Sequence, residues 1–193
     1  MNRSKFLETI RVVDAKAQNL EYHQRRMYDA LGSDIYRLDM LIEAPSCGVY
    51  RCRVIYDNES ISIEYHPYKK RHIESLKIVE SNSILYDKKY LDREAIEALF
   101  AKRGESDDIL IVKNSLITDT SIANVAFFDS KRWLTPKTPL LAGTTRQRLL
   151  DEGKIFEADI YLDDLKRYTK MALMNAMIDF DIIAKEKIED IVC

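Results

Sequence analysis

The sequence has few of the residues that build disulfide frameworks or metal sites. Its 193 residues include three cysteines, Cys47, Cys52 and Cys193, and only three histidines. The cysteines are odd in number and contain no CxxC pair, so they do not resemble a zinc-binding set. We therefore expect no metal site, and a protein of the reducing cytoplasm.

The sequence also lacks an excess of basic charge and long apolar runs. Its 30 lysines and arginines nearly balance 32 acidic residues, giving a formal net charge of -2. A nucleic-acid-binding protein normally carries a basic excess. No apolar run approaches the ~20 residues that span a bilayer, and the charged N-terminus lacks the apolar core of a signal peptide. We expect a cytoplasmic protein that binds neither nucleic acid nor membrane.

What is present is enough apolar material for a core, since 46% of the residues are hydrophobic. Phe6–Val13 suits a strand. Asn19–Gly32 suits a helix, with Asn19 as a possible N-cap and Gly32 just past its end. Alternating β-forming residues predict an antiparallel hairpin and a possible third strand, at residues 49–56, 61–68 and 73–80.

Residues 81–89 have weak periodicity and a polar start, which makes them the best candidate for a crossing between two halves. We therefore divide the chain into residues 1–86, an N-terminal α+β subdomain, and residues 87–193, a C-terminal subdomain. The second half predicts helices at 92–103 and 146–153, with mixed short helix and strand in the tail. Short strands joined by tight antiparallel returns are predicted at residues 108–113, 116–118, 124–129 and 132–136. The predicted fold class is α+β, with mostly antiparallel strands.

Two polar stretches in the first half are candidates for chemistry. His23–Arg26 places adjacent long polar side chains on the first helix, although a solvated helix face would have the same composition. Lys88 and Lys89 precede the helix predicted at 92–103. The helix dipole slightly disfavours a charged amine at a helix N-terminus, and lower basicity suits a lysine that forms a covalent bond to a carbonyl. The simpler interpretation is an exposed lysine pair.

Two further stretches lie in the second half. Asp119, Thr120, Ser121 and Asn124 interrupt apolar strands; they are either turn formers or a carboxylate held in a defined, buried place. A Gly-Thr-Thr step at 143–145 opens a predicted helix. Free N–H groups and hydroxyls at a helix start can bind phosphate, while the simpler interpretation is an ordinary N-cap by one of the threonines.

The order of these four stretches resembles the class IV aminotransferase family of pyridoxal-phosphate enzymes. His23-Gln24-Arg25-Arg26 resembles the early H-x-x-R of that family. Lys89-Tyr90-Leu91-Asp92-Arg93 resembles K-x-L-N-R of its aminodeoxychorismate lyase branch. The run at 118–125 is similar to the T-E…S/A-N segment, with Asp119 in place of glutamate. Residues 134–136 and 140–146 resemble L-x-TP and L-x-GITR.

The resemblance implies a role for each matched residue. Lys89 would bind the cofactor covalently and act as the catalytic base, and Asp119 would pair with the pyridine nitrogen, although its arm is shorter than that of glutamate. The residues implied in holding pyridoxal 5'-phosphate are Arg26, Lys89, Asp119, Thr144, Thr145 and, from a weaker match near the end, Asn175 and Ala176. The resemblance also implies the class IV fold of two small α/β subdomains, the second of which binds the cofactor, and a homodimer.

Three functions follow as alternatives from the resemblance. The K-x-L-D-R run favours an aminodeoxychorismate lyase-like enzyme that releases pyruvate and gives 4-aminobenzoate for folate synthesis. The second is an aminotransferase acting on a small amino acid of the branched-chain or D-amino acid type. The third is an inactive relative with a binding or structural role. The sequence does not identify the residues that recognise the amino substrate, since Arg51 and Arg53 suit either a carboxylate or a solvated strand face.

Overall fold

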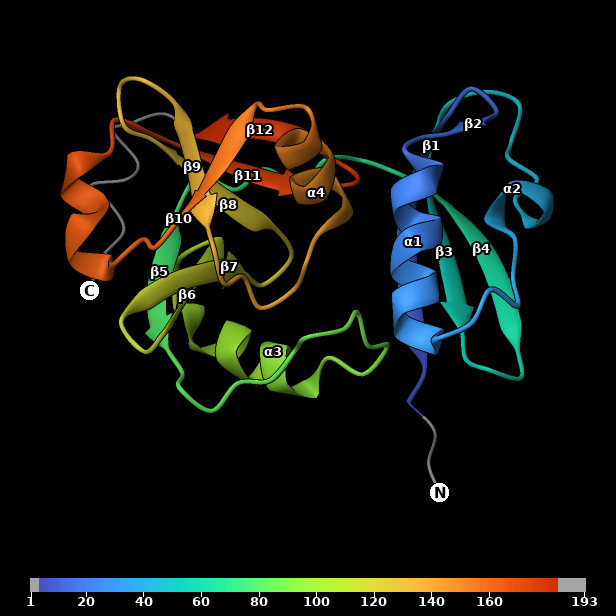
Figure 1. The fold of residues 1–193 in the computed structure, drawn as a ribbon, viewed down its shortest axis with the longest axis horizontal. Coiled ribbons are helices and arrows are strands. Elements are labelled where there is room, and N and C mark those ends of the chain that lie inside the picture. Colours follow the sequence, from blue (N-terminus) through green and yellow to red (C-terminus); the bar gives the residue numbers. More distant parts are fainter. Residues whose placement is uncertain (1–3, 184–193) are drawn as a thin grey trace. The chain divides into compact units, whose positions relative to one another are not determined.

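The computed structural model describes residues 4–183, and the chain divides into two compact units (Figure 1). The first unit contains Met1–Lys70 and Lys88–Asp92, and the second contains Arg71–Asp87 and Arg93–Cys193. Residues 184–193, where the predicted mixed tail ends, lie outside the described residues and include Cys193. None of the helices in residues 4–183 is long and apolar enough to cross a membrane.

The described part of the first unit is built on a four-stranded antiparallel sheet in the order β2-β1-β3-β4. The strands are β1 (Phe6–Val13), β2 (Lys16–Ala17), β3 (Val49–Tyr56) and β4 (Ile61–Pro67). Alternate residues of β1 and β3 are buried, as expected for strands with one face on a core. The predicted hairpin is thereby confirmed as β3 and β4.

Helix α1 (Leu20–Leu31) packs on one face of this sheet, and a short helix, α2 (Leu38–Leu41), follows it (Figure 1). The predicted ends of α1 are confirmed. Asn19 precedes the helix in the left-handed region, at φ 53°, and makes no side-chain cap. Gly32 ends the helix at φ 70°, where a residue without a Cβ is favoured.

In the described part of the second unit, eight strands form a mixed sheet. Strands β5 to β10 follow one another in the sheet, β11 pairs with β8, and β12 pairs with β11. Only the pairs β5–β6 and β9–β10 are parallel. The strands are β5 (Leu76–Glu80), β6 (Asp108–Lys113), β7 (Leu116–Thr120), β8 (Asn124–Phe128), β9 (Trp133–Pro136), β10 (Ile155–Ala158), β11 (Lys170–Asn175) and β12 (Asp179–Ile183).

Strand β5 is the third strand predicted in the first half, but it does not extend the β3–β4 hairpin. It pairs in parallel with β6, over thirty residues further along the chain. Residues 71–87 therefore belong to the second unit, whereas the predicted division kept all residues up to 86 in the first.

The two α-helices of the second unit are α3 (Glu94–Phe100) and α4 (Thr144–Asp151). The helix predicted at 92–103 begins two residues late, with Arg93 as its N-cap, and its last turn is a 3-10 helix, Ala101–Arg103. The 3-10 helix Leu162–Arg167 lies between β10 and β11. The core of this unit is aliphatic and aromatic and includes Leu110, Ile117, Val125 and Phe127.

Candidate active site

Lys89 belongs to the first unit because its short segment pairs with the start of β1. The Leu7 N–H donates to the Lys89 carbonyl at 2.9 Å, and the Leu91 N–H donates to the Lys5 carbonyl at 2.8 Å. Its side chain is half-buried. The first residue of α3 comes five residues later and belongs to the second unit, and the field of a helix dipole acts mainly at its first turn. Pairing with β1, not the helix end, therefore holds Lys89.

Arg26 is held by a buried carboxylate that the sequence analysis did not single out. Its Nε donates to Glu8 Oε1 at 2.9 Å and its Nη2 donates to Glu8 Oε2 at 2.5 Å, a bidentate pair. The Glu8 side chain is 0% exposed and that of Arg26 is 15% exposed. The sequence carried a signal for Glu8, since alternation along β1 points it to the same face as Phe6, Ile10 and Val12.

The same carboxylate binds His23, the other matched residue of α1. His23 Nδ1 lies 2.6 Å from Glu8 Oε2, and both side chains are fully buried. Burial lowers the pKa of His23, and the charges of Arg26 and Lys89 add to this effect, while Glu8 opposes it without reversing it. His23 is therefore neutral at pH 7, so Nδ1 donates to Glu8, and Nε2 is a buried acceptor without a partner among the described residues.

Glu8 itself stays ionised. Burial alone would raise its pKa, but the charge of Arg26 and the hydrogen bonds from His23 and Arg26 outweigh burial and lower the pKa to about 2. Glu8, His23 and Arg26 thus form a buried ionic cluster in the first unit. Lys89 lies within electrostatic range of this cluster, through its effect on His23.

In the second unit, Asp119 occupies the defined, buried place that one interpretation of its sequence required. It lies near the end of β7 and is 5% exposed. The Asn124 side-chain amide donates to Oδ1 at 2.7 Å, and the Leu141 N–H donates to Oδ2 at 3.0 Å. Burial raises the pKa of Asp119 to about 6, although these hydrogen bonds oppose the rise. Both donors are neutral groups.

Thr144 and Thr145 are the first two residues of α4, and both are buried. The simpler interpretation, in which one of them is the N-cap, is wrong, because Gly143 holds that position and no side chain caps the helix. A Cβ at Gly143 would overlap Oδ1 of Asn124. The absence of a side chain at this position therefore brings the start of α4 against the residue that also binds Asp119.

Asn175, at the end of β11, joins the same neighbourhood. Its Nδ2 donates to the Ile122 carbonyl in the β7–β8 turn at 3.2 Å, and its Oδ1 accepts the N–H groups of Met177 and Ile178. Ala176 lies in the turn that these bonds close, and both Asn175 and Ala176 are half-buried. The structure thus links Asp119, Asn124 and Gly143 directly, and Asn175 through the β7–β8 turn. Arg26 and Lys89 are residues of the other unit.

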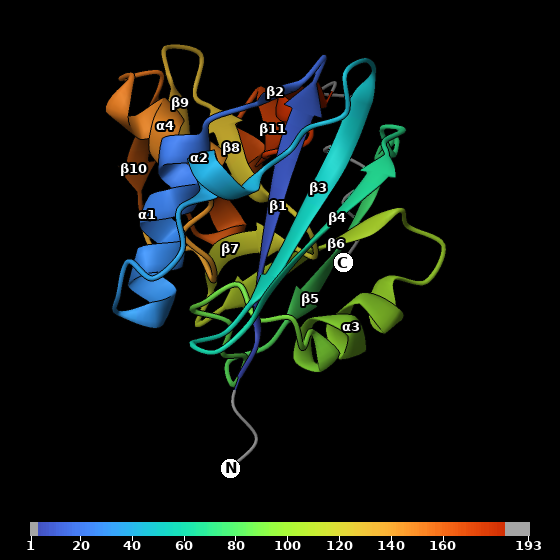
Figure 2. The same cartoon turned by 90° about the vertical axis from the view of Figure 1, so that its right-hand side faces the viewer.

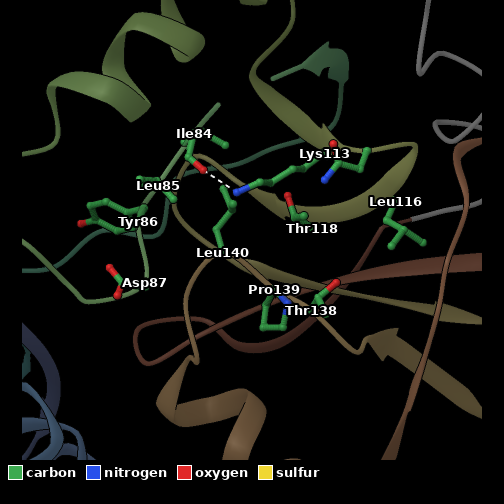
Figure 3. Close-up of a pocket in the computed structure, with 11 residues that line it drawn as sticks. Ile84, Leu85, Tyr86, Asp87, Lys113, Leu116, Thr118, Thr138, Pro139 and Leu140 are labelled. Carbon is green, nitrogen blue, oxygen red and sulfur yellow. Dashed lines mark hydrogen bonds between the residues drawn. The ribbon is translucent and has the colours of Figure 1, made fainter. Parts of the chain in front are cut away.

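A cavity of about 400 Å³ lies elsewhere in the second unit (Figure 3). Lys113 extends along its wall and donates from Nζ to the Ile84 carbonyl at 2.7 Å. Its walls also include Thr118 and Leu140, the sequence neighbours of Asp119 and Leu141. None of the predicted site residues lines it. Residues 4–183 contain no group of histidine, cysteine and acidic side chains that could hold a metal ion.

Comparison with known proteins decides the family. Residues 54–184 match the amino-transferase class IV family. An uncharacterised protein of Haemophilus influenzae is 38% identical over 180 residues, which cover 88% of this chain and 96% of that protein. The chain belongs to the aminotransferase class IV family.

Solved structures agree with this family. A candidate 4-amino-4-deoxychorismate lyase from Haemophilus somnus 129PT is 31% identical, with a TM-score of 0.84 over 92% of this chain and 98% of that one. A hypothetical aminotransferase from Mycobacterium tuberculosis, solved in a PLP-bound form, has a TM-score of 0.73 over 93% of this chain and 80% of that one; at 18% identity it shows a shared fold. The predicted class IV family, the α+β class IV fold and the prediction of an enzyme are confirmed.

Two features of this class IV chain suit pyridoxal phosphate, the cofactor that its family implies. Asp119 is a buried carboxylate whose hydrogen bonds come from neutral groups, so a protonated ring nitrogen would give it a cationic partner. The start of α4 offers first-turn N–H groups beside two threonines, an arrangement suited to a phosphate. The residues present therefore fit such a cofactor.

Proposed function

We propose that the protein is a pyridoxal-phosphate-dependent lyase that releases pyruvate from an aminodeoxychorismate-like substrate and gives 4-aminobenzoate. The observation that carries this proposal is the K-x-L-D-R run that begins at Lys89, a half-buried lysine beside a buried ionic cluster. The similarity to a candidate lyase over nearly that protein's whole length also supports it.

Each predicted residue has a distinct role in this proposal. Lys89 holds the cofactor covalently and then accepts the proton from the substrate carbon. Asp119 accepts a hydrogen bond from the ring nitrogen and keeps it protonated. The phosphate ligands are Arg26 and the first-turn groups of α4 at Thr144 and Thr145, while Asn175 and Ala176 are weaker candidates.

The cofactor, when bound, withdraws the electron pair that remains on the substrate carbon after proton loss. The protein supplies position and charge. The ionised Glu8 fixes the guanidinium of Arg26, so a phosphate would meet a donor whose rotamer is already set. Neutral His23 adds no second positive charge to this cluster.

An aminotransferase acting on a small amino acid is the second candidate. It needs the same lysine, carboxylate and phosphate ligands, and it differs only in where the proton returns. The structural likeness to an aminotransferase supports the shared fold and does not separate the two reactions. We also propose a homodimer, which sedimentation of the purified protein would test.

The first experiment is to purify the protein with pyridoxal phosphate, reduce it with borohydride and map the modified peptide by mass spectrometry. We expect a visible absorption band and an adduct on Lys89, and neither in Lys89→Ala. Lys88→Arg is the matched control, because Lys88 donates to the Ala30 carbonyl and is not proposed to bind cofactor. A colourless protein without an adduct would support the inactive relative instead.

The second experiment separates the two reactions by their products. Aminodeoxychorismate is supplied, and pyruvate and 4-aminobenzoate are measured together. Pairs of amino acids and keto acids are then supplied, and new amino acids are measured. Equal amounts of pyruvate and 4-aminobenzoate support the lyase. Amino transfer without these two products contradicts the lyase and supports the aminotransferase.

A further inference from the structure

One face of the sheet in the first unit carries an unusual row of basic side chains. Glu8 binds His23 of α1, so this side of β1 faces the helix. Side chains alternate along a strand, which places Thr9 and Arg11 on the opposite face. Figure 2 shows β1, β3 and β4 side by side, and the strand register defines which residues share that face.

The register places two arginines directly opposite each other. Arg11 of β1 pairs with Arg51 of β3, which in turn pairs with His66 of β4. In the neighbouring row, Arg53 pairs with Glu64. Residues in such direct pairs have Cβ atoms roughly 4.5–5.5 Å apart, and like charges at that distance destabilise a sheet.

The acidic residue on this face does not compensate the pair. Glu64 binds Arg53 at 3.1 Å and His66 at 3.2 Å. Neither the Arg11 nor the Arg51 side chain forms a hydrogen bond or ion pair with another residue of 4–183, and the Nε of Arg11 is buried without a partner. A buried donor without an acceptor is unfavourable, so both arginines leave the folded protein with donors that a ligand could satisfy.

We propose that Arg11 and Arg51 bind a carboxylate of the substrate. This inference rests on the proposed function for the identity of the ligand, because both the lyase substrate and amino acids carry carboxylates. A guanidinium presents a planar fork that matches a carboxylate, and two forks side by side suit one carboxylate strongly or a dicarboxylate. The cofactor phosphate has other proposed ligands, so these arginines serve the substrate.

The test uses succinate as the probe and measures its binding to the cofactor-free protein by calorimetry. Arg11→Gln and Arg51→Gln are each expected to weaken binding about tenfold or more, since each removes charge-assisted hydrogen bonds. The matched control is Arg37→Gln, because Arg37 is exposed on the same unit and pairs with Asp39. It should bind succinate like the wild type.

Two further readouts exclude a merely structural role. The side-chain Nε–H signals of Arg11 and Arg51 should shift on titration with succinate in ¹⁵N spectra. Without anion, Arg51→Gln should melt a few degrees higher than the wild type because it relieves like-charge repulsion, and succinate should raise the melting temperature only of the wild type. A variant that melts lower without anion contradicts this reasoning.

Other outcomes would overturn the proposal. These are wild-type protein that does not bind succinate, binding that survives in both variants, and inorganic phosphate that binds the pair more tightly than succinate. Because succinate binding needs neither cofactor nor turnover, a failed lyase or aminotransferase assay leaves the result interpretable. Conversely, an active enzyme whose two arginine variants bind succinate normally would refute this inference alone.

Discussion

Replacing Glu8 with glutamine removes one charge from the buried ionic cluster while keeping the volume of the side chain. Arg26 would lose its bidentate partner, and the new amide group would place a donor against a donor. Removing one partner of a buried ion pair typically costs about 3–5 kcal/mol. The pKa of Glu8, lowered from 4.5 to about 2, corresponds independently to about 3 kcal/mol of stabilisation at neutral pH.

The pH dependence of this effect has a definite sign. A lowered carboxyl pKa stabilises the folded protein above the unfolded value of 4.5, and this stabilisation is lost as the pH falls toward 2. Urea unfolding followed by circular dichroism should therefore give Glu8→Gln a free energy of unfolding about 3–5 kcal/mol below the wild type at pH 7. The difference should shrink between pH 4.5 and 2.

Glu64→Gln is the matched control, because Glu64 lies on the same sheet and also binds an arginine and a histidine, but in an exposed position. Exposed ion pairs contribute little, so its unfolding should change far less. A loss at pH 7 as small as that of Glu64→Gln, or one that does not depend on pH, would refute the reasoning about the buried cluster.

Three predictions concern the second unit. Gly143→Ala should lower the free energy of unfolding by about 1–3 kcal/mol in urea, because its Cβ overlaps Asn124. It should also weaken binding of pyridoxal phosphate more than that of pyridoxal, which lacks the phosphate. Asn124→Ala should raise the Asp119 pKa above about 6, measured from the pH dependence of its carboxyl ¹³C shift, because a donor to the ionised form is lost. A raised carboxyl pKa makes ionisation destabilising, so the cofactor-free wild type should lose about 3 kcal/mol relative to Asp119→Asn as the pH rises from 3.8 through about 6.

Local patterns in the sequence predict the elements of the fold better than their partners. Alternation along β1, β3 and β4 predicts three strands and a hairpin, and Gly32 marks the end of α1, because these signals are local. The partner of β5 lies on β6, far along the chain, and nothing in the five residues of β5 distinguishes a parallel from an antiparallel neighbour. The division of the chain was therefore harder to predict than the strand itself.

The candidate site shows the same limit. The order of motifs predicts roles for Arg26, Lys89 and Asp119, and these roles stay predictions. The contacts around them come from distant residues, such as the bond from Leu141 N–H to Asp119, and no local pattern announces them. Glu8 is different. An acidic residue on the inward face of an alternating strand must find partners, so its position alone indicated a buried cluster.

The two buried carboxylates differ in what their surroundings already supply. Glu8 has a bidentate arginine and a histidine donor, so its charge is satisfied within the folded unit and its pKa falls to about 2. Asp119 is equally enclosed, but only neutral groups donate to it, and its pKa rises to about 6. A cationic ligand therefore gains little at Glu8 and much at Asp119. This contrast explains why Glu8 suits the positioning of Arg26, while Asp119 suits the direct recognition of a protonated ring nitrogen.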